Sequence, residues 1–362
     1  MKSRKFIDNK WQVNRFCAEV FQGLEKVFEN EIKKITGGRV RIISSTPGLV
    51  YFETIFNLSK LYEIKTASSV FVVISVEGNI SSPENEKKII ARIKQIIAEN
   101  NELYGEEIFK TFKITADESA SKNFVRLKEI IHEKTQLDLV FKGGDLVMKS
   151  AFRKKEFFIR ISPRPLSVRF WRNANYNAAL NASIAASMVF LTSPDKEDRV
   201  LNICAGSGSL LIERCLLSPN PREALGFELL GEVVDIAKHN LKESGIPKKY
   251  RIEKGDCEQL SQIISEGQKF NVVLGDLPFG MTVGHKKTNR SLYKKIVLEL
   301  FKVCDNKTRV ALITHDIQSL ELVIEEFKDR LKVKEKMQIK MSTQRYGMYI
   351  YPMIYIMELL TA

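Results

Sequence analysis

A regular alternation of strand and helix patterns runs through the second half of this 362-residue chain. Short apolar runs bounded by turn residues indicate buried strands, and the segments between them carry apolar residues at helical spacing. We expect strands at 199–203, 223–228, 250–254, 270–275 and 308–314, helices at 178–192, 208–216, 231–244, 257–266, 291–303 and 316–329, and closing strands near 332–340 and 348–359. This alternation predicts an α/β fold with a doubly wound, Rossmann-like parallel sheet, whose ligands bind at the carboxyl ends of the strands.

The first half of the chain lacks this rhythm. Strand and helix patterns follow one another irregularly up to about residue 162, which indicates a smaller α+β region with mixed strands. The stretch SPRPLSVRFWRNANYN at 162–177 is rich in Pro, Arg and Asn. We place the linker between the two parts of the chain there, because such segments punctuate regular structure.

Positive charge gathers in the first half. The formal net charge is +13, and the densest basic stretch is 149–172, where eight basic residues accompany one acid, Glu156. A concentration of this kind favours a polyanionic partner. A solvated basic face remains an equally good interpretation of the charge run alone.

The five cysteines include no Cys-x-x-Cys pair, which argues against a disulfide framework and against a metal site of closely spaced ligands. No apolar run approaches the ~18 residues that a membrane span needs. The basic N-terminal segment MKSRKFIDNKW lacks the apolar stretch of a signal peptide. These features predict a cytoplasmic protein without a bound metal.

Four polar features end successive strands of the second half. Gly206-Ser207-Gly208 follows the first strand and opens a helix, where glycines permit close approach of a ligand and the helix start offers free N–H groups. Glu228 ends the next strand, where an acid can accept hydrogen bonds from ribose hydroxyls. A nicotinamide cofactor would fit these two features. Asp256 ends a third strand, where its carboxylate can meet the amine of adenine, and Asp276-Leu277-Pro278-Phe279 ends a fourth.

As a set, these features resemble a class I S-adenosylmethionine-dependent methyltransferase. The residues that the resemblance assigns to the cofactor are Asn202, Ala205, Gly206, Ser207, Gly208, Glu228, Asp256, Cys257 and Asp276. Asp-Leu-Pro-Phe is similar to the Asp/Asn-Pro-Pro-Tyr/Phe motif of enzymes that methylate exocyclic amines of bases. The catalytic candidates are therefore Asp276, Leu277, Pro278 and Phe279.

The chemistry of a base amine explains this composition. The amine donates its lone pair into the ring, which makes it a poor nucleophile. We expect Asp276 and the carbonyl of Leu277 each to accept one N–H of the amine and to stabilise positive charge as it forms. Pro278 would fix the turn, and Phe279 would stack on the base.

The whole chain resembles the THUMP-containing RNA guanine-N2 methyltransferases. The resemblance rests on GLEKVFENEI, STPGLVYFE, FKITADESASKNF, NAALNASIAASMVFLT and, most specifically, GDLPFG followed by SLYKKIVLEL. It implies a ferredoxin-like domain at 1–60, a THUMP RNA-binding domain at 61–165, a linker at 166–180 and a Rossmann-like methyltransferase domain at 181–362. The implied product is N2-methylguanosine at position 6 of the tRNA acceptor stem. We expect the enzyme to be a monomer.

Basic residues before and within the linker, and after Phe279, are the candidates for contact with the tRNA acceptor stem and 3′ end. They are Arg153, Lys154, Lys155, Arg164, Arg169, Arg172, Lys286, Lys287 and Arg290.

One departure from the family pattern concerns the cofactor. Asn202 stands where relatives carry an acid that orients the methionine amino group, and Glu213 is the nearest replacement acid, expected to be partly exposed. Asn202 can still accept a hydrogen bond through its carbonyl. The alternatives are guanine-N2 methylation at another tRNA or ribosomal RNA site, and a noncatalytic RNA-binding scaffold that Asn202 and Ala205 would favour.

Overall fold

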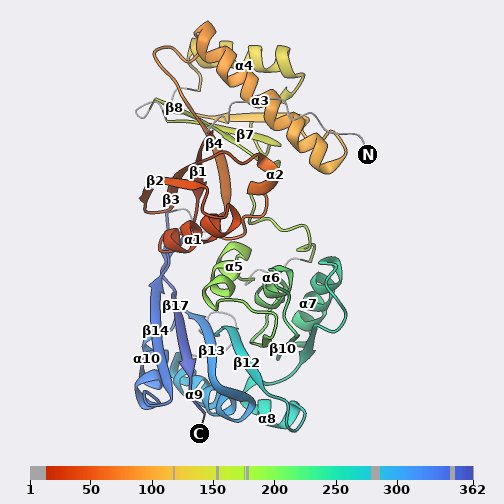
Figure 1. Ribbon diagram of the computed structural model, residues 1–362, viewed down its shortest axis with the longest axis vertical. Coiled ribbons are helices and arrows are strands. Elements are labelled where there is room, and N and C mark those ends of the chain that lie inside the picture. Colours follow the sequence, from red (N-terminus) through yellow and green to blue (C-terminus); the bar gives the residue numbers. More distant parts are fainter. Residues whose placement is uncertain are drawn as a thin grey trace. The chain divides into compact units, whose positions relative to one another are not determined.

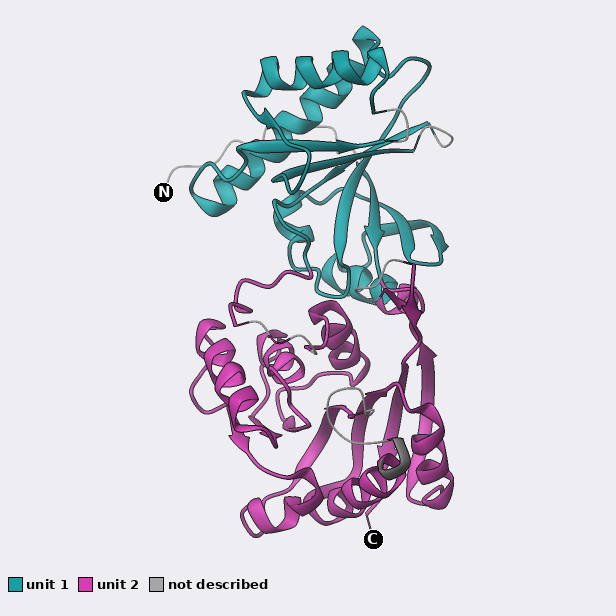
Figure 2. Cartoon of the chain, turned by 180° about the vertical axis from the view of Figure 1, so that it is seen from behind, with its two compact units in different colours: residues 1–20, 28–166 teal, residues 21–27, 167–362 magenta. Residues whose placement is uncertain are grey.

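The computed structural model describes residues 14–116, 119–151, 155–174, 176, 179–278, 286–342 and 347–361, and only the backbone of residues 286–288. The chain divides into two compact units (Figure 2). Unit 1 comprises residues 1–20 and 28–166, and unit 2 comprises residues 21–27 and 167–362. The finer division into domains at 1–60 and 61–165 stays a prediction.

Unit 1 contains one mixed sheet with helices packed on it. Among the described residues the strand order is β2-β3-β1-β4-β8-β7-β5-β6. The strands are β1 (Asn14–Glu19), β2 (Val40–Thr46), β3 (Leu49–Thr54), β4 (Ser69–Ser75), β5 (Thr111–Thr115), β6 (Asp138–Leu139), β7 (Leu146–Ala151) and β8 (Glu156–Arg160), and the helices are α1 (Glu25–Ile35), α2 (Leu58–Leu61), α3 (Pro83–Tyr104) and α4 (Lys122–Thr135). In Figure 1, α3 and α4 lie on the same face of this sheet.

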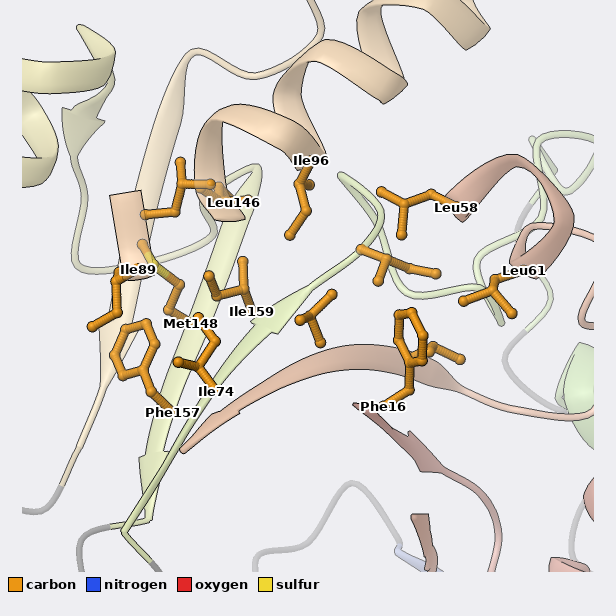
Figure 3. Close-up of a cluster of buried hydrophobic side chains, with 14 of the residues drawn as sticks. Phe16, Leu58, Leu61, Ile74, Ile89, Ile96, Leu146, Met148, Phe157 and Ile159 are labelled. Atoms are coloured by element: carbon orange, nitrogen blue, oxygen red, sulfur yellow. The ribbon is translucent and has the colours of Figure 1, made fainter. Parts of the chain in front are cut away.

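Helix α3 shows why these residues form these elements. The Ser82 side chain accepts a hydrogen bond from the Asn85 N–H at 3.4 Å, and Pro83 follows at the first helical position. The helix ends at Gly105, whose φ of 74° only glycine adopts easily. In between, Ile89 and Ile96 face the sheet, where they pack near the sheet residues drawn in Figure 3.

Unit 2 contains the expected doubly wound sheet. Its strand order is β11-β10-β9-β12-β13-β17-β14. The strands are β9 (Arg199–Ile203), β10 (Glu223–Glu228), β11 (Arg251–Lys254), β12 (Phe270–Asp276), β13 (Cys304–Thr314), β14 (Leu331–Gln338) and β17 (Met353–Leu359), with β15 (Met341–Ser342) and β16 (Tyr349–Ile350) forming a separate pair. Strands β9 to β13 run parallel, whereas β17 pairs antiparallel with both β13 and β14. The α/β class with a Rossmann-like second half is therefore confirmed.

Helices cover both faces of the unit 2 sheet (Figure 1). They are α5 (Ala182–Leu191), α6 (Ser209–Leu216) and α7 (Gly231–Glu243) on one face, and α8 (Leu260–Ile263), α9 (Lys286–Val303) and α10 (Ile317–Glu326) on the other. Because both faces are buried, successive strand residues such as Val200 and Leu201 enter opposite cores, and the strands read as continuous apolar runs. None of the helices in the described ranges is both long and apolar enough to cross a membrane.

The strand order reverses between β9 and β12. The chain moves outward from β9 to β10 and β11, and then returns to the other side of β9 with β12 and β13. Such a switch point leaves a crevice at the carboxyl ends of the two central strands, where α/β proteins bind their ligands. Close packing there requires Gly275, because a Cβ at this position would lie 2.7 Å from Ile203 Cγ1 and 2.9 Å from Leu312 Cδ2.

Candidate active site

The carboxyl edge of the unit 2 sheet brings the predicted strand-end residues together. Asn202 of β9 is the register partner of both Gly226 in β10 and Leu274 in β12. Glu228 and Asp276 each lie two residues beyond these partners. Because side chains alternate along a strand, they project on the same face of the sheet as Asn202.

The glycine loop between β9 and α6 has the expected ligand-binding geometry. Gly206 and Gly208 adopt positive φ angles of 53° and 87°, and no atom lies within 4 Å of a Cβ built on Gly206. The Gly206 N–H donates to Glu228 Oε2 at 2.9 Å, and the Leu230 N–H donates to Glu228 Oε1 at 3.1 Å. Glu228 therefore fixes the loop, and each of its oxygens retains a lone pair for a hydroxyl donor.

Asn202 supplies the clearest sign of a missing ligand. Its side chain is fully buried, and its Nδ2 donates to the carbonyls of Ile203 and Leu274, both at 3.1 Å. Among the described residues, its Oδ1 has no hydrogen-bond partner. A buried acceptor left without a donor costs about 1–3 kcal/mol. The ammonium group of a bound methionyl moiety would supply that donor, so this observation fits S-adenosylmethionine.

Asp256 and Cys257 lie at the start of the turn after β11. Asp256 accepts a hydrogen bond from the Glu258 N–H at 2.8 Å, which caps a 3₁₀ helix over Cys257–Gln259. The buried Cys257 Sγ accepts from the Cys204 N–H at 3.3 Å. Contact with the Cys257 thiol, together with burial, raises the pKa of Cys204 well above its usual value. Cys257 thus braces the loop after β9, and the contact of Asp256 with adenine stays a prediction.

The turn after β12 presents an uncompensated carboxylate. Asp276 is half-buried, and burial raises its pKa to about 7. The Leu277 N–H donates to the Ile313 carbonyl at 2.9 Å. The Leu277 carbonyl has no hydrogen-bond partner within the part of the chain that the structure describes. Phe279 lies outside the described residues, so its stacking role stays a prediction.

Two tyrosines that the sequence analysis did not select lie at the same edge. The Tyr293 hydroxyl donates to the Pro278 carbonyl at 2.6 Å and pairs with Thr314 Oγ1 at 2.9 Å. Burial raises the pKa of Tyr176, and the carboxylates of Glu228 and Asp276 raise it further. Tyr293 stands in SLYKKIVLEL, but an aromatic residue at helical spacing gave no signal beyond a core position.

The guanidinium groups of two predicted RNA contacts, Arg169 and Arg172, bind other residues of unit 2. Arg169 is buried, and its Nε lies 2.8 Å from Oε1 of Glu213, an acid that is itself buried rather than partly exposed. Arg172 is half-buried, and its Nη2 donates to the Leu180 carbonyl at 2.8 Å and to Ser209 Oγ at 2.6 Å. Both guanidinium groups therefore pack inside unit 2 against α6, where the α6 acid and hydroxyl pair with them.

The other RNA candidates remain predictions. Lys155 and Arg164 are exposed, and Arg290 is exposed with a distant ion pair to Glu326 at 3.8 Å. Arg153 and Lys154 lie outside the described residues, and so do the side chains of Lys286 and Lys287. In the described ranges, no group of three or more His, Cys, Asp or Glu residues could hold a metal ion.

Comparison with known proteins identifies the domain that carries this site. Residues 169–346 match the family model described as RMKL-like, methyltransferase domain. The chain is 24% identical over 369 residues to the curated tRNA (guanine(6)-N2)-methyltransferase of Methanocaldococcus jannaschii, which covers 88% of this chain and 94% of the relative.

Solved structures share the fold over nearly the whole chain. The crystal structure of TrmN from Thermus thermophilus superposes with a TM-score of 0.69 at 17% identity, covering 96% of this chain and 100% of that one. SMU.472, a putative methyltransferase solved in complex with SAH, superposes with a TM-score of 0.60 at 14% identity, covering 97% and 99%. Together with the match of residues 169–346 to the RMKL-like methyltransferase domain, these similarities show that this chain is an S-adenosylmethionine-dependent methyltransferase.

Proposed function

We propose that this enzyme transfers a methyl group to the exocyclic N2 amine of a guanosine in tRNA. The observation that carries the proposal is the pair of acceptors at the switch point: the Asp276 carboxylate and the Leu277 carbonyl have no partners among the described residues. An exocyclic amine has two N–H groups, which matches two adjacent acceptors. The relative from Methanocaldococcus jannaschii, named for guanine-N2 methylation of tRNA, supports this choice of base and nucleic acid.

Each acceptor has a defined task. Asp276 and Leu277 would each accept one N–H of the amine, which turns its lone pair toward the methyl donor. The negative charge of Asp276 stabilises the positive charge that develops on the nitrogen. Holding two reactants in this register contributes about 7–11 kcal/mol to catalysis in favourable cases.

S-adenosylmethionine, when bound, supplies an electrophilic methyl group on a sulfonium. Asn202 would accept from the methionyl ammonium, Glu228 from ribose hydroxyls and Asp256 from the adenine amine. Gly206 leaves space for this group beside the loop, since nothing lies within 4 Å of a Cβ at its position. The proton that the amine loses leaves through Asp276 or water.

We further propose that the target is guanosine 6 of the acceptor stem. A paired guanosine hides its amine inside the duplex, so the base must flip out to reach Asp276. Recognition then rests on the shape and phosphates of the RNA. The chain's net charge of +13 suits such a partner, and binding should weaken steeply with salt.

The test is to incubate tRNA that lacks N2-methylguanosine with the full chain and labelled S-adenosylmethionine, and to map the product by nuclease digestion and mass spectrometry. The expected product is N2-methylguanosine at position 6, formed about 10²–10³-fold more slowly when Asp276→Ala replaces the wild type. The exposed Asp235 provides a matched control as Asp235→Ala. Label in another nucleoside, or in ribosomal RNA alone, would overturn the assignment.

A further inference from the structure

Leu277 and Pro278, the described residues that follow β12, are each held by a hydrogen bond to another element. On one side, the Leu277 N–H donates to the Ile313 carbonyl at 2.9 Å. On the other, the Pro278 carbonyl accepts from the Tyr293 hydroxyl at 2.6 Å. The Pro278 ring fixes φ between these two points. The Leu277 carbonyl lies along the chain between these two hydrogen bonds, which restrict the rotation of its peptide group.

Tyr293 belongs to a chain of hydrogen bonds with a defined order. The Asp316 N–H donates to Thr314 Oγ1 at 3.0 Å, and Thr314 Oγ1 lies 2.9 Å from the Tyr293 hydroxyl. A tyrosine hydroxyl has one proton, and Tyr293 uses it on Pro278. Thr314 must therefore donate to Tyr293, so each group donates to the next and polarises it.

Burial raises the pKa of Tyr293 well above its usual value. The hydroxyl therefore keeps its proton over the working pH range and acts as a donor. The side chain is 1% exposed, so the phenol is enclosed by protein while its hydroxyl reaches the backbone of the turn.

We propose that Tyr293 is a positioning residue that sets the direction of the Leu277 carbonyl, and with it the angle at which the base amine meets the methyl donor. This inference rests on the proposed function. Tyr293 touches neither base nor cofactor in this scheme, because it acts through the Pro278 carbonyl.

The chain offers a closely matched control. Tyr250 is also 1% exposed, and its hydroxyl also donates to a proline carbonyl, that of Pro221, at 2.7 Å. Pro221 and Tyr250 precede β10 and β11 respectively, so this bond lies at the amino edge of the same sheet, away from the turn. Tyr293→Phe and Tyr250→Phe each delete one hydroxyl from equivalent surroundings.

The experiment measures kcat and KM for tRNA, the Kd of S-adenosylhomocysteine and the thermal midpoint for the full chain and both variants. Tyr293→Phe should lower kcat about 10- to 100-fold, because small misplacements of reacting groups have effects of this size. Its KM and Kd should stay within twofold of wild type. Both variants should lower the thermal midpoint by similar amounts. Tyr250→Phe, however, should keep kcat within twofold of wild type.

A second pair of variants probes the hydrogen-bond chain. Thr314→Val should also lower kcat, by a smaller factor than Tyr293→Phe. Thr314→Ser keeps the hydroxyl and should retain most of the wild-type kcat. A Tyr293→Phe enzyme with kcat within twofold of wild type overturns the proposal. So does an equal loss of kcat in Tyr250→Phe, because stability alone would then account for both.

Methyl incorporation is counted in total RNA, whatever nucleoside carries it. The ratio of variant to wild type therefore tests Tyr293 even if the product is not N2-methylguanosine. A product of the wrong identity together with a slow Tyr293→Phe overturns the proposed substrate and supports the positioning role. A wild-type chain that transfers no methyl group to any RNA overturns both.

Discussion

The two edges of the unit 2 sheet surround an aspartate in opposite ways. At the amino edge, Asp198 is fully buried and is surrounded by donors: Arg214 Nη2 lies 2.7 Å away, Arg309 pairs with its other oxygen, and the Asp195 N–H donates at 3.0 Å. At the carboxyl edge, Asp276 has no ion pair or side-chain hydrogen bond within the described residues, and burial raises its pKa to about 7.

This difference separates a residue kept for stability from one kept for chemistry. Removing a carboxylate from water is unfavourable unless charges and donors replace the water. Asp198 has those replacements inside the chain. Asp276 lacks them, and groups left in this state cluster at functional sites. The amino edge thus stabilises the sheet, and the carboxyl edge presents a carboxylate that a ligand can bind.

The largest effect is expected at the amino edge. Asp198→Ala leaves Arg214 buried without its partner, which should lower the free energy of unfolding by roughly 3–5 kcal/mol. Urea denaturation followed by circular dichroism measures this loss. The folded fraction should keep its kcat, and a loss below about 1 kcal/mol would remove the distinction between the edges.

Asp276→Ala should lower activity and leave stability intact, which is the reverse of the effect of Asp198→Ala. Losing one preorganised electrostatic contact to the transition state lowers kcat by about 10²–10³, whereas the thermal midpoint at pH 8 should stay level or rise, because an unpaired carboxylate is gone. Asp276→Asn should be intermediate, since its carbonyl still accepts one N–H. A variant that unfolds more readily than wild type would show Asp276 to be structural.

The dependence of stability on pH should reveal the Asp276 carboxyl. In the unfolded chain the Asp276 carboxyl ionises near its ordinary value of 3.8, whereas in the fold its pKa is about 7. Stability should therefore fall as the pH rises from about 4 to about 7 and level off above, because the unfolded chain releases its proton first.

The ionised form accepts the amine hydrogens, so log kcat/KM should rise with a slope near one up to about pH 7. Asp276→Asn should abolish this inflection in the pH–rate profile. An inflection that persists in the variant would assign the titration to another group.

The smallest effect is expected at Asn202. Its unpaired Oδ1 would accept from a charged donor, a bond of about 1.5–3 kcal/mol, so Asn202→Ala should weaken S-adenosylhomocysteine binding at least about tenfold in calorimetry. Asn202→Asp should destabilise the apo fold, because its carboxylate would face the Ile203 and Leu274 carbonyls that Nδ2 now binds. Unchanged cofactor affinity in Asn202→Ala would contradict this role.

The sequence predicted the carboxyl edge better than anything else in the molecule. Strand ends are marked locally by an apolar run followed by Gly206, Glu228 or Asp276, and parallel strands bring such ends to one edge whatever lies between them. The long-range pairs had no such local mark. Arg169 stands in a dense basic run, so it was assigned to RNA, whereas its burial depends on Glu213, 44 positions further along the chain.

Tyr293 and the helix ends show the same limit. A tyrosine among apolar residues at helical spacing predicts a core position, which is correct, but its hydroxyl partner Pro278 lies in another element. Helix α3 extends over Pro83–Tyr104, but its apolar pattern marks only its middle. Its first and last turns are polar, and only the caps at Ser82 and Gly105 mark its ends.

The most direct test of the account removes only the proposed acceptor. A tRNA with inosine in place of the target guanosine keeps the ring and its carbonyl but lacks the N2 amine. We expect this tRNA to bind the full chain with a Kd within about threefold of the guanosine form and to receive no methyl group in single-turnover assays. Methylation of the inosine tRNA at a comparable rate would show that another atom accepts the methyl group, and Asp276 would lose the role assigned to it.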